Sequence, residues 1–219
     1  MSENSAVPWG DPKRLLKRTG PAFALANTRH YDSHPTDPEN DTDIDQCIQR
    51  LLDNDPTLKE INMNNMKRTP IPQLRRLLEA LAYNEYCERL SLANMGLHDN
   101  DLAILMPVLE INTGLKKLNL ETNYLSGDFF IKFFQAALAQ QTLEEIRATN
   151  QGTSFTNLEE KEIVDNIVAN TGLTKVSISL RLQEDRNAVE KAVMRNGDLK
   201  RQVRRLEAME KRMSASPRN

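Results

Sequence analysis

A short apolar pattern recurs five times along the chain. In each copy a leading apolar residue is followed three positions later by an aliphatic residue, and two positions after that by another apolar one. The leading residues, spaced 29, 28, 28 and 30 positions apart, are Leu58, Cys87, Leu115, Leu143 and Leu173. The inner pairs are Ile61 and Met63, Leu90 and Leu92, Leu118 and Leu120, Ile146 and Ala148, and Val176 and Ile178. This alternation predicts very short strands, and the spacing is typical of leucine-rich repeats.

Helical patterns separate these strands. Residues 71–84 carry leucines at 74, 77, 78 and 81, which form one apolar stripe on a helix. The stretches 99–112, 127–140 and 158–171 show similar stripes, with apolar positions Leu102, Leu105, Leu109, Phe130, Phe133, Ala137, Leu138, Ile163, Ile167 and Val168. The repeated unit is therefore a strand, a loop, a helix and a loop. Each strand can be short because it pairs with the strands of adjacent copies while the helices stack on one face.

Both ends of the array are expected to be closed by helices. Residues 42–53 place Ile44, Cys47 and Ile48 on one helical side, and Thr42 with Asp45 resembles a capping box. Residues 184–213 form a long helical pattern in which Gly197 is expected to cause a break or a bend. Residues 1–40, rich in Pro, Asp and Asn, are predicted to be a disordered or extended leader.

The predicted fold is an α/β leucine-rich-repeat solenoid, a right-handed superhelix like that of ribonuclease inhibitor. It has about five strand–helix repeats, a short parallel sheet, an N-terminal cap helix and a long C-terminal helix. The predicted boundaries are a leader at 1–40 and a repeat domain at 41–213, followed by a disordered tail at 214–219. Within the repeat domain the cap helix covers about 42–53, the repeats about 54–183 and the C-terminal helix about 184–213.

Charge and composition narrow the classes of function. The chain has 219 residues and a net charge of −2, but residues 31–180 hold 13 basic and 23 acidic residues, whereas residues 181–219 hold 11 basic and six acidic ones. An acidic body argues against nucleic-acid binding. No signal peptide and no apolar run of about 20 residues is found, and two cysteines form no disulfide framework. We expect a soluble, cytoplasmic monomer that binds neither nucleic acid nor membrane.

Catalytic chemistry is not indicated. No phosphate-binding glycine loop, zinc helix or paired-cysteine motif is present. His30 and His34 lie four residues apart, a spacing that places two side chains together only in a helix. Prolines nearby make a helix unfavourable there, so we expect no metal site. Cys87 occupies a position that leucine fills in other copies, which favours a buried small apolar residue over a reactive thiol. We predict a protein that is not an enzyme and needs no cofactor.

Three surfaces are candidates for binding a partner. The first is the concave face of the sheet, with Asn62, Ser91, Asn119, Arg147 and Ser177, for which a plain solvated surface is the alternative. The second is the row of strand-to-helix loops, with candidates Asn65, Met66, Asn94, Met95, Glu121, Thr122, Tyr124, Asn150 and Gln151. Tyr124 is the best single anchor there, whereas Asn123 is interpreted as structural, because asparagine side chains satisfy backbone groups in loops.

The third candidate surface is the basic face of the C-terminal helix. Its residues are Lys200, Arg201, Arg204 and Arg205, with Leu199, Val203 and Leu206 on the opposite side. Two interpretations of this helix remain: it is an arm that binds a partner, or its basic face is solvated and partly folds back on the acidic body. The apolar side is expected to be used in packing rather than in membrane binding.

Several ordered motifs together resemble the tropomodulin family, including its leiomodin relatives. They are EINMNN followed by IPQLRRLLEALAYN, then LNLETNYLSG, EEIRATNQG and RNGDLKRQVRRLE, preceded by the acidic stretch HPTDPENDTDIDQCIQRLLDND. The resemblance covers roughly residues 35–212. It implies a cytoskeletal protein that caps the pointed end of actin filaments, with the strand-to-helix loops and the C-terminal helix as the actin-binding surfaces.

The resemblance also leaves some functions open. It does not reach the family's N-terminal half, which holds the tropomyosin-binding helices, so tropomyosin is not counted among the expected partners. Without that attachment the avidity for actin would be lower. The alternatives are a leucine-rich scaffold that recognises another protein, and a regulator of an enzyme comparable to ribonuclease inhibitors or GTPase activators. Those regulators use more than five repeats, which counts against the last interpretation.

Overall fold

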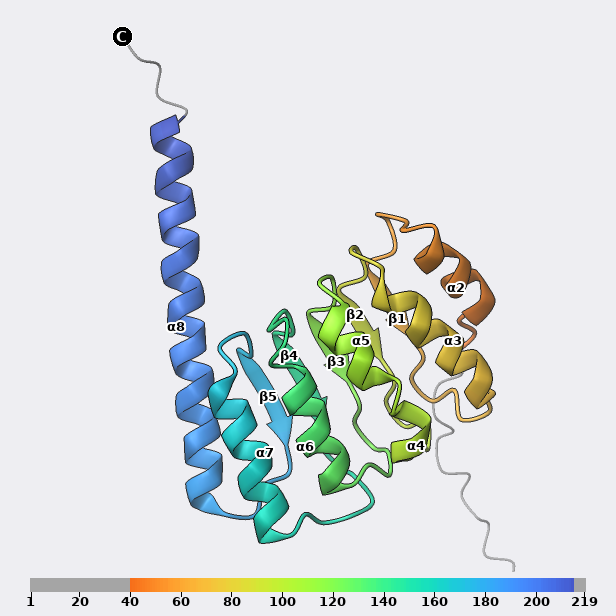
Figure 1. The fold of residues 1–219 in the computed structure, drawn as a ribbon. Helices are drawn as coiled ribbons and strands as arrows, with labels where there is room; N and C mark the ends of the chain where they lie inside the picture. The colour runs from red at the N-terminus through yellow and green to blue at the C-terminus, as the bar shows by residue number, and fades with distance from the viewer. Residues whose placement is uncertain (1–39, 215–219) are drawn as a thin grey trace, which may run out of the picture. The chain divides into compact units, whose positions relative to one another are not determined.

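The computed structural model describes residues 40–214, in which five short parallel strands alternate with helices (Figure 1). The strands are β1 (Glu60–Asn62), β2 (Arg89–Ser91), β3 (Lys117–Asn119), β4 (Glu145–Ala148) and β5 (Lys175–Ile178). They form one sheet in the order β1-β2-β3-β4-β5, so every strand pairs with the strands of adjacent repeats. The aliphatic residue Leu118 of β3 is in register with Leu90 and Ile146. The predicted α/β leucine-rich-repeat fold is confirmed.

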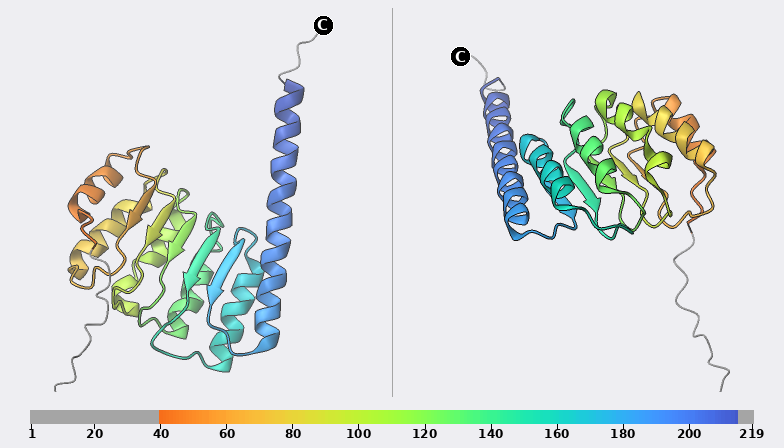
Figure 2. Two further views of the ribbon diagram at one scale, coloured as in Figure 1. Left: turned by 180° about the vertical axis from the view of Figure 1, so that it is seen from behind. Right: turned by 60° about the horizontal axis from the view of Figure 1, so that its bottom comes forward.

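The helices cover one face of this sheet and leave the other face open, as Figure 2 shows from behind. They are α2 (Ile44–Leu52), α3 (Ile71–Ala82), α4 (Asp99–Leu102), α5 (Leu105–Ile111), α6 (Gly127–Ala136), α7 (Asn157–Ala169) and α8 (Gln183–Ser214). The core lies between the two layers, where Leu118 and Ile146 of the sheet and Phe130 and Phe133 of α6 are almost fully buried. The predicted apolar stripes therefore point toward the sheet.

The helix over 99–112 and the N-cap of α2 differ from their predictions. The stretch 99–112 is two helices instead of one, because Pro107 has no N–H for the carbonyl of Ala103 and its ring crowds that carbonyl, and the helix is interrupted at 103–104. The N-cap of α2 is Asp43, which accepts a 3.0 Å hydrogen bond from the backbone N–H of Gln46. The Thr42 hydroxyl instead donates to the carbonyl of Asn62 at the open edge of β1 (2.7 Å).

Gly197 does not interrupt α8, which continues through it to Ser214. Glycine inside a helix costs about 1 kcal/mol relative to alanine, which is less than the packing of a helical face can supply. Val189, Ala192 and Asn196 of α8 are buried against the last repeat. The predictions for residues 1–39 and 215–219 lie outside the described residues.

Buried asparagines at three equivalent positions each join a repeat to the helix that precedes it. The Nδ2 group of Asn112 donates to the carbonyl of Leu81 at the end of α3 (2.7 Å), and its Oδ1 accepts from the N–H of Leu115 (2.7 Å). Asn84 and Asn170 do the same in their repeats, with the carbonyls of Leu51 and Ala137 as acceptors. These asparagines close the C-terminal end of the previous helix and fix the start of the next strand.

Candidate functional site

The predicted binding residues fall into two groups at opposite edges of the sheet. The strand-to-helix loops follow the carboxyl ends of the strands, as Asn150 and Gln151 follow β4. Helix α8 starts at that edge, runs antiparallel to β5 and extends past the other edge (Figures 1 and 2). There Lys200 forms an ion pair with Glu144, the residue directly before β4. The structure therefore separates the loop row from the basic face of α8.

The loop row has an unusual and repeated backbone. Asn65, Asn94, Thr122 and Asn150 occupy equivalent positions, and all four have left-handed φ angles, between 55° and 68°. Asparagine tolerates this region better than most residues, whereas β-branched residues such as threonine rarely adopt it. Thr122 is therefore an unusual residue at this position. The N–H groups of the first three donate to carbonyls of the following repeat, at Ala93, Glu121 and Thr149. The loops are thus held in a fixed line across the repeats.

The next position in each loop points inward. It is occupied by Met66, Met95, Asn123 and Gln151, and the predicted contact residue Met95 is buried, with 5 % of its surface exposed. Met66 is half-buried and packs against the core. Met95 is therefore corrected from a contact residue to a core residue, because its side chain faces the space between sheet and helix, as that of Asn123 does in the next loop.

In the later repeats an amide takes the same inward position. Asn123 donates to the carbonyls of Leu92 and Leu120 and accepts from the N–H groups of Met95 and Leu97, which confirms its structural interpretation. Gln151 donates to the carbonyl of Leu120 and accepts from the N–H of Leu125. Its amide is used inside the protein, so it is poorly available to a partner.

Tyr124 is the exposed aromatic residue of the loop row, with 54 % of its surface accessible. Its ring stacks on His98 with 5.1 Å between ring centroids. The ring also covers Gly152, where a Cβ would overlap it. These residues border a shallow hollow of about 210 Å³ whose lining includes Lys67, Asn94, Gly96, Thr122, Asn123, Tyr124, Asn150 and Gly152. The exposed ring of Tyr124 is thus held on both sides, by His98 and by Gly152.

The last part of α8, residues 201–214, is called its free part here. Every residue from 201 to 214 is exposed, including Arg204 and Arg205, and Arg201 pairs with Asp198 of the same helix. An apolar stripe that begins just before this part is also exposed and consists of Leu199, Val203, Leu206, Met209 and Met213. The prediction that Leu206 packs against the body is wrong, because α8 extends beyond the repeats there. Leu199 and Val203 are about half exposed and border a hollow of about 400 Å³ that Gln141 and Thr142 of the repeats also line.

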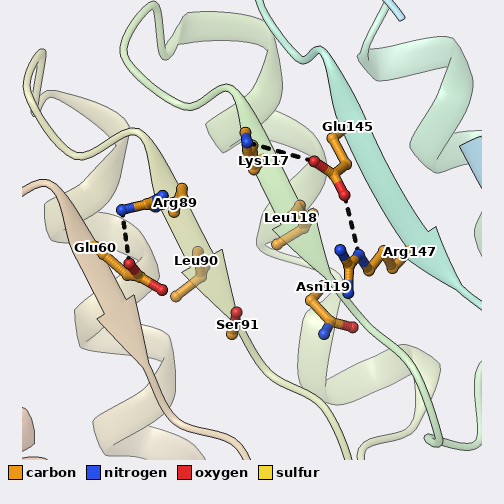
Figure 3. Close-up of a pocket in the computed structure, with 9 residues that line it drawn as sticks. All are labelled: Glu60, Arg89, Leu90, Ser91, Lys117, Leu118, Asn119, Glu145 and Arg147. Atoms are coloured by element: carbon orange, nitrogen blue, oxygen red, sulfur yellow. Dashed lines mark hydrogen bonds and ion pairs between the residues drawn. The ribbon is translucent and has the colours of Figure 1, made fainter. Parts of the chain in front are cut away.

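A charged row on the concave face was missed by the sequence interpretation. One residue before the aliphatic position of each strand, the register aligns Glu60, Arg89, Lys117, Glu145 and Lys175. Arg89 pairs with Glu60 (2.8 Å), and Glu145 pairs with Arg147 (3.0 Å) and Lys117 (3.5 Å) (Figure 3). Glu145 also pairs with Lys175 of β5 (2.9 Å). All five copies have a charged residue at this position, so aligning the copies by sequence would have predicted the row.

Glu145 is the most strongly stabilised carboxylate of this face. Hydrogen bonds from Lys175 and Arg147 lower its pKa to about 2, against the effect of partial burial. Its side chain is 13 % exposed, whereas the three cations around it are about half exposed. One carboxylate therefore holds three basic side chains on adjacent strands.

A metal site, a membrane span and a reactive thiol each place definite requirements on the described residues. Among residues 40–214, no group of three His, Cys, Asp or Glu side chains could hold a metal ion. None of the helices in that range is long and apolar enough to cross a membrane. Cys87 is fully buried as predicted, and burial raises its pKa to about 11, so its thiol stays protonated at neutral pH.

Comparisons with known proteins agree on one family. The family model described as the TMOD/LMOD leucine-rich domain matches residues 40–199. Tropomodulin of Caenorhabditis elegans is 36 % identical over 163 residues, which is 74 % of this chain and 42 % of the relative. Human leiomodin-3 is 31 % identical over 192 residues, which is 88 % of this chain and 33 % of the relative. The chain thus spans less than half the length of these relatives.

Solved structures agree with this. A C-terminal domain of tropomodulin from Caenorhabditis elegans has a TM-score of 0.72 and 35 % identity, covering 76 % of this chain and 99 % of that one. A structure titled leiomodin-1 actin-binding site 2 has a TM-score of 0.73 and 30 % identity, covering 78 % of this chain and 99 % of that one.

Proposed function

The chain belongs to the tropomodulin and leiomodin family through its leucine-rich domain, and we propose that it is a cytoplasmic, non-enzymatic protein that binds actin and regulates the pointed ends of filaments. One observation carries the proposal. The solved domain titled as an actin-binding site of leiomodin-1 is matched over 99 % of its length by this fold. The relatives' other segments are not part of that match, so the proposal concerns the leucine-rich domain.

Two separate contacts are proposed for actin. At the carboxyl edge of the sheet, Tyr124 supplies an aromatic anchor, flanked by exposed Thr122 and Asn150 and by half-buried Asn65, Asn94 and Glu121. At the other edge, Arg204 and Arg205 project on the free part of α8, where they suit an acidic partner such as actin. Because these edges are opposite, one flat actin surface cannot cover both, and the contacts would involve different parts of the filament end.

Filament elongation tests the proposal directly. Actin filaments with blocked fast-growing ends are grown with and without the protein at micromolar concentration. Slower growth is expected for the wild-type chain, and the double charge reversal Arg204→Glu with Arg205→Glu should raise the half-inhibitory concentration by about three- to tenfold, since exposed charges mainly affect the association rate. Arg75→Glu with Arg76→Glu on the exposed side of α3 is the matched control and should leave inhibition unchanged.

The contrary result is equally informative. If the folded wild-type protein leaves elongation unchanged, pointed-end regulation by this chain is excluded, and a scaffold that recognises another protein becomes the better interpretation. If both double variants inhibit as well as the wild type, the actin contact does not use the free part of α8.

A further inference from the structure

Two like charges lie side by side at the centre of the concave face. Arg89 of β2 and Lys117 of β3 are register partners on adjacent strands. Along the charged row the signs are negative, positive, positive, negative and positive, so only this pair places like charges next to each other. The two like charges repel each other, and each is offset by an ion pair with a carboxylate on its other side.

The two side chains turn away from each other. Arg89 points to Glu60 and Lys117 points to Glu145, which leaves a space between them (Figure 3). Glu145 must also balance Arg147 and Lys175. On this face four basic side chains thus share two carboxylates, and β2 and β3 are adjacent strands that each contribute a cation and no carboxylate to the row.

That space is a hollow of about 250 Å³. It is lined by Glu60, Arg89, Leu90, Ser91, Lys117, Leu118, Asn119, Glu145 and Arg147. Ser91 and Asn119 follow the two basic residues by two positions on the same strands and add a hydroxyl and an amide. The Oδ1 of Asn119 accepts from the N–H of Glu121 (2.9 Å), which fixes the orientation of this amide.

We propose that the hollow is an interaction surface for an acidic segment of a protein partner, with a carboxylate of that segment between Arg89 and Lys117. Such a group would complete the alternation of charge across the sheet and could accept hydrogen bonds from both side chains. This inference goes beyond the proposed function, since it uses a different face of the molecule and does not require actin as the partner.

The chemistry of the face favours a protein segment over other anions. Arg89 and Lys117 are about half exposed, so a lone ion would be held weakly in competition with water. A segment adds contacts with the polar row of Ser91 and Asn119. A nucleic acid would bring many phosphates to a body in which residues 31–180 carry more acidic than basic residues, and most of those phosphates would be repelled.

A fluorescent oligoglutamate peptide tests the surface. Its anisotropy is titrated with the full chain at low ionic strength, where such contacts are least screened. The double reversal Arg89→Glu with Lys117→Glu should weaken binding at least about tenfold. The control Arg75→Glu with Arg76→Glu makes the same change of charge on α3, on the opposite side of the domain, and should retain most of the affinity.

A third variant is expected to improve binding, which a folding defect would not do. Glu145→Gln frees Lys117, Arg147 and Lys175 from their shared carboxylate and should tighten oligoglutamate binding by about threefold or more. The proposal is overturned if both double reversals weaken binding equally, if an oligoglutamine peptide binds as well, or if inorganic phosphate binds as tightly as the peptide. It is also overturned if the wild-type chain does not bind oligoglutamate.

Discussion

At the scale of single residues, the inward position of the strand-to-helix loops shows how one site is filled in two ways. Met95 fills it with an apolar side chain, whereas Asn123 fills it with an amide that uses its oxygen and its nitrogen on loop backbone groups. Gln151 repeats the amide solution with a longer side chain. The two solutions are compatible because a buried amide is tolerated once its hydrogen bonds are made.

Glu145 gives a residue-scale prediction with a defined pH dependence. Glu145→Gln should lower the free energy of unfolding by about 1–2 kcal/mol at pH 7, because three basic side chains lose their shared carboxylate. The folded-state pKa is about 2 and the ordinary value is 4.5, so this contribution is fully present above pH 4.5 and is lost as the pH falls toward 2.

Urea denaturation of both proteins at pH 7 and near pH 3 measures this difference. Glu79→Gln, at an exposed position of α3, is the matched control and should change stability little at either pH. A Glu145→Gln difference that stays constant between the two pH values would show that the carboxylate contributes through packing and not through its charge.

The sequence predicted some of these residues correctly and missed others for a physical reason. The structural role of Asn123 followed from the general behaviour of asparagine in loops. The burial of Met95 did not, because an apolar residue in a polar loop can face either solvent or the core. Aligning Met66, Met95, Asn123 and Gln151 by repeat would have shown that one inward position is shared. The charged row on the concave face was missed for the same reason, since it is seen only when the five copies are aligned.

At the scale of elements, α8 is attached to the last repeat by a short segment. Val189 and Ala192 supply apolar contacts, and the Nδ2 group of Asn196 donates to the carbonyls of Asn170 (2.8 Å) and Leu173 (2.7 Å). Asn170 in turn donates to the carbonyl of Ala137 (3.0 Å). The line of buried asparagines that joins the repeats therefore continues into α8.

Removing this attachment is the element-scale prediction. Asn196→Ala should lower the free energy of unfolding by about 2–3 kcal/mol, since the carbonyl of Leu173 loses its side-chain donor, that of Asn170 keeps only a 3.4 Å bond from Arg195, and the side chain leaves a void. Asn187→Ala on the same helix removes an exposed amide that is bonded to Gln183 and should change stability by less than about 0.5 kcal/mol. Urea denaturation measures both, and equal effects would contradict the role assigned to Asn196.

The interruption between α4 and α5 could have been predicted from the sequence. Leu102, Leu105 and Leu109 give an unbroken helical stripe, which is why a single helix was expected. Pro107 changes the backbone without changing the stripe, since the buried leucines stay buried on both sides of the break. Periodicity reports which side chains face the core and is insensitive to a single missing backbone hydrogen bond.

At the scale of the whole repeat domain, the lengths of the helices explain the separation of the two predicted surfaces. Helix α7 has 13 residues and α8 has 32, which correspond to about 20 and 48 Å along the axis. Both run opposite to the strands, so the longer helix must extend past the amino edge of the sheet (Figure 1). The predicted helix over 184–213 already had nearly this length. The prediction did not include the consequence that a helix running opposite to the strands ends far from the strand-to-helix loops.

Truncation tests the independence of the free part of α8. A chain ending at Lys200 keeps the buried Val189, Ala192 and Asn196 and loses only residues that are exposed or not described. Its free energy of unfolding should lie within about 0.5 kcal/mol of the full chain. Urea denaturation checks this, and truncation before Val189 is the contrasting variant that should be strongly destabilised. A large loss on ending at Lys200 would show that the free part contacts the repeats.

The position of Asn196 directly before Gly197 also affects how this protein ages. In flexible chains this dipeptide is where the asparagine amide is most readily lost, because the unhindered glycine nitrogen attacks the side-chain carbonyl; asparagine is among the thermolabile residues for this reason. Here the helical backbone and burial hold both groups out of reaction geometry. Once α8 opens and the amide becomes a carboxylate, a negative group would face the carbonyls of Asn170 and Leu173, and that helix could no longer close normally. The fraction of molecules deamidated at Asn196 would thus increase irreversibly with the time that α8 spends detached from the last repeat.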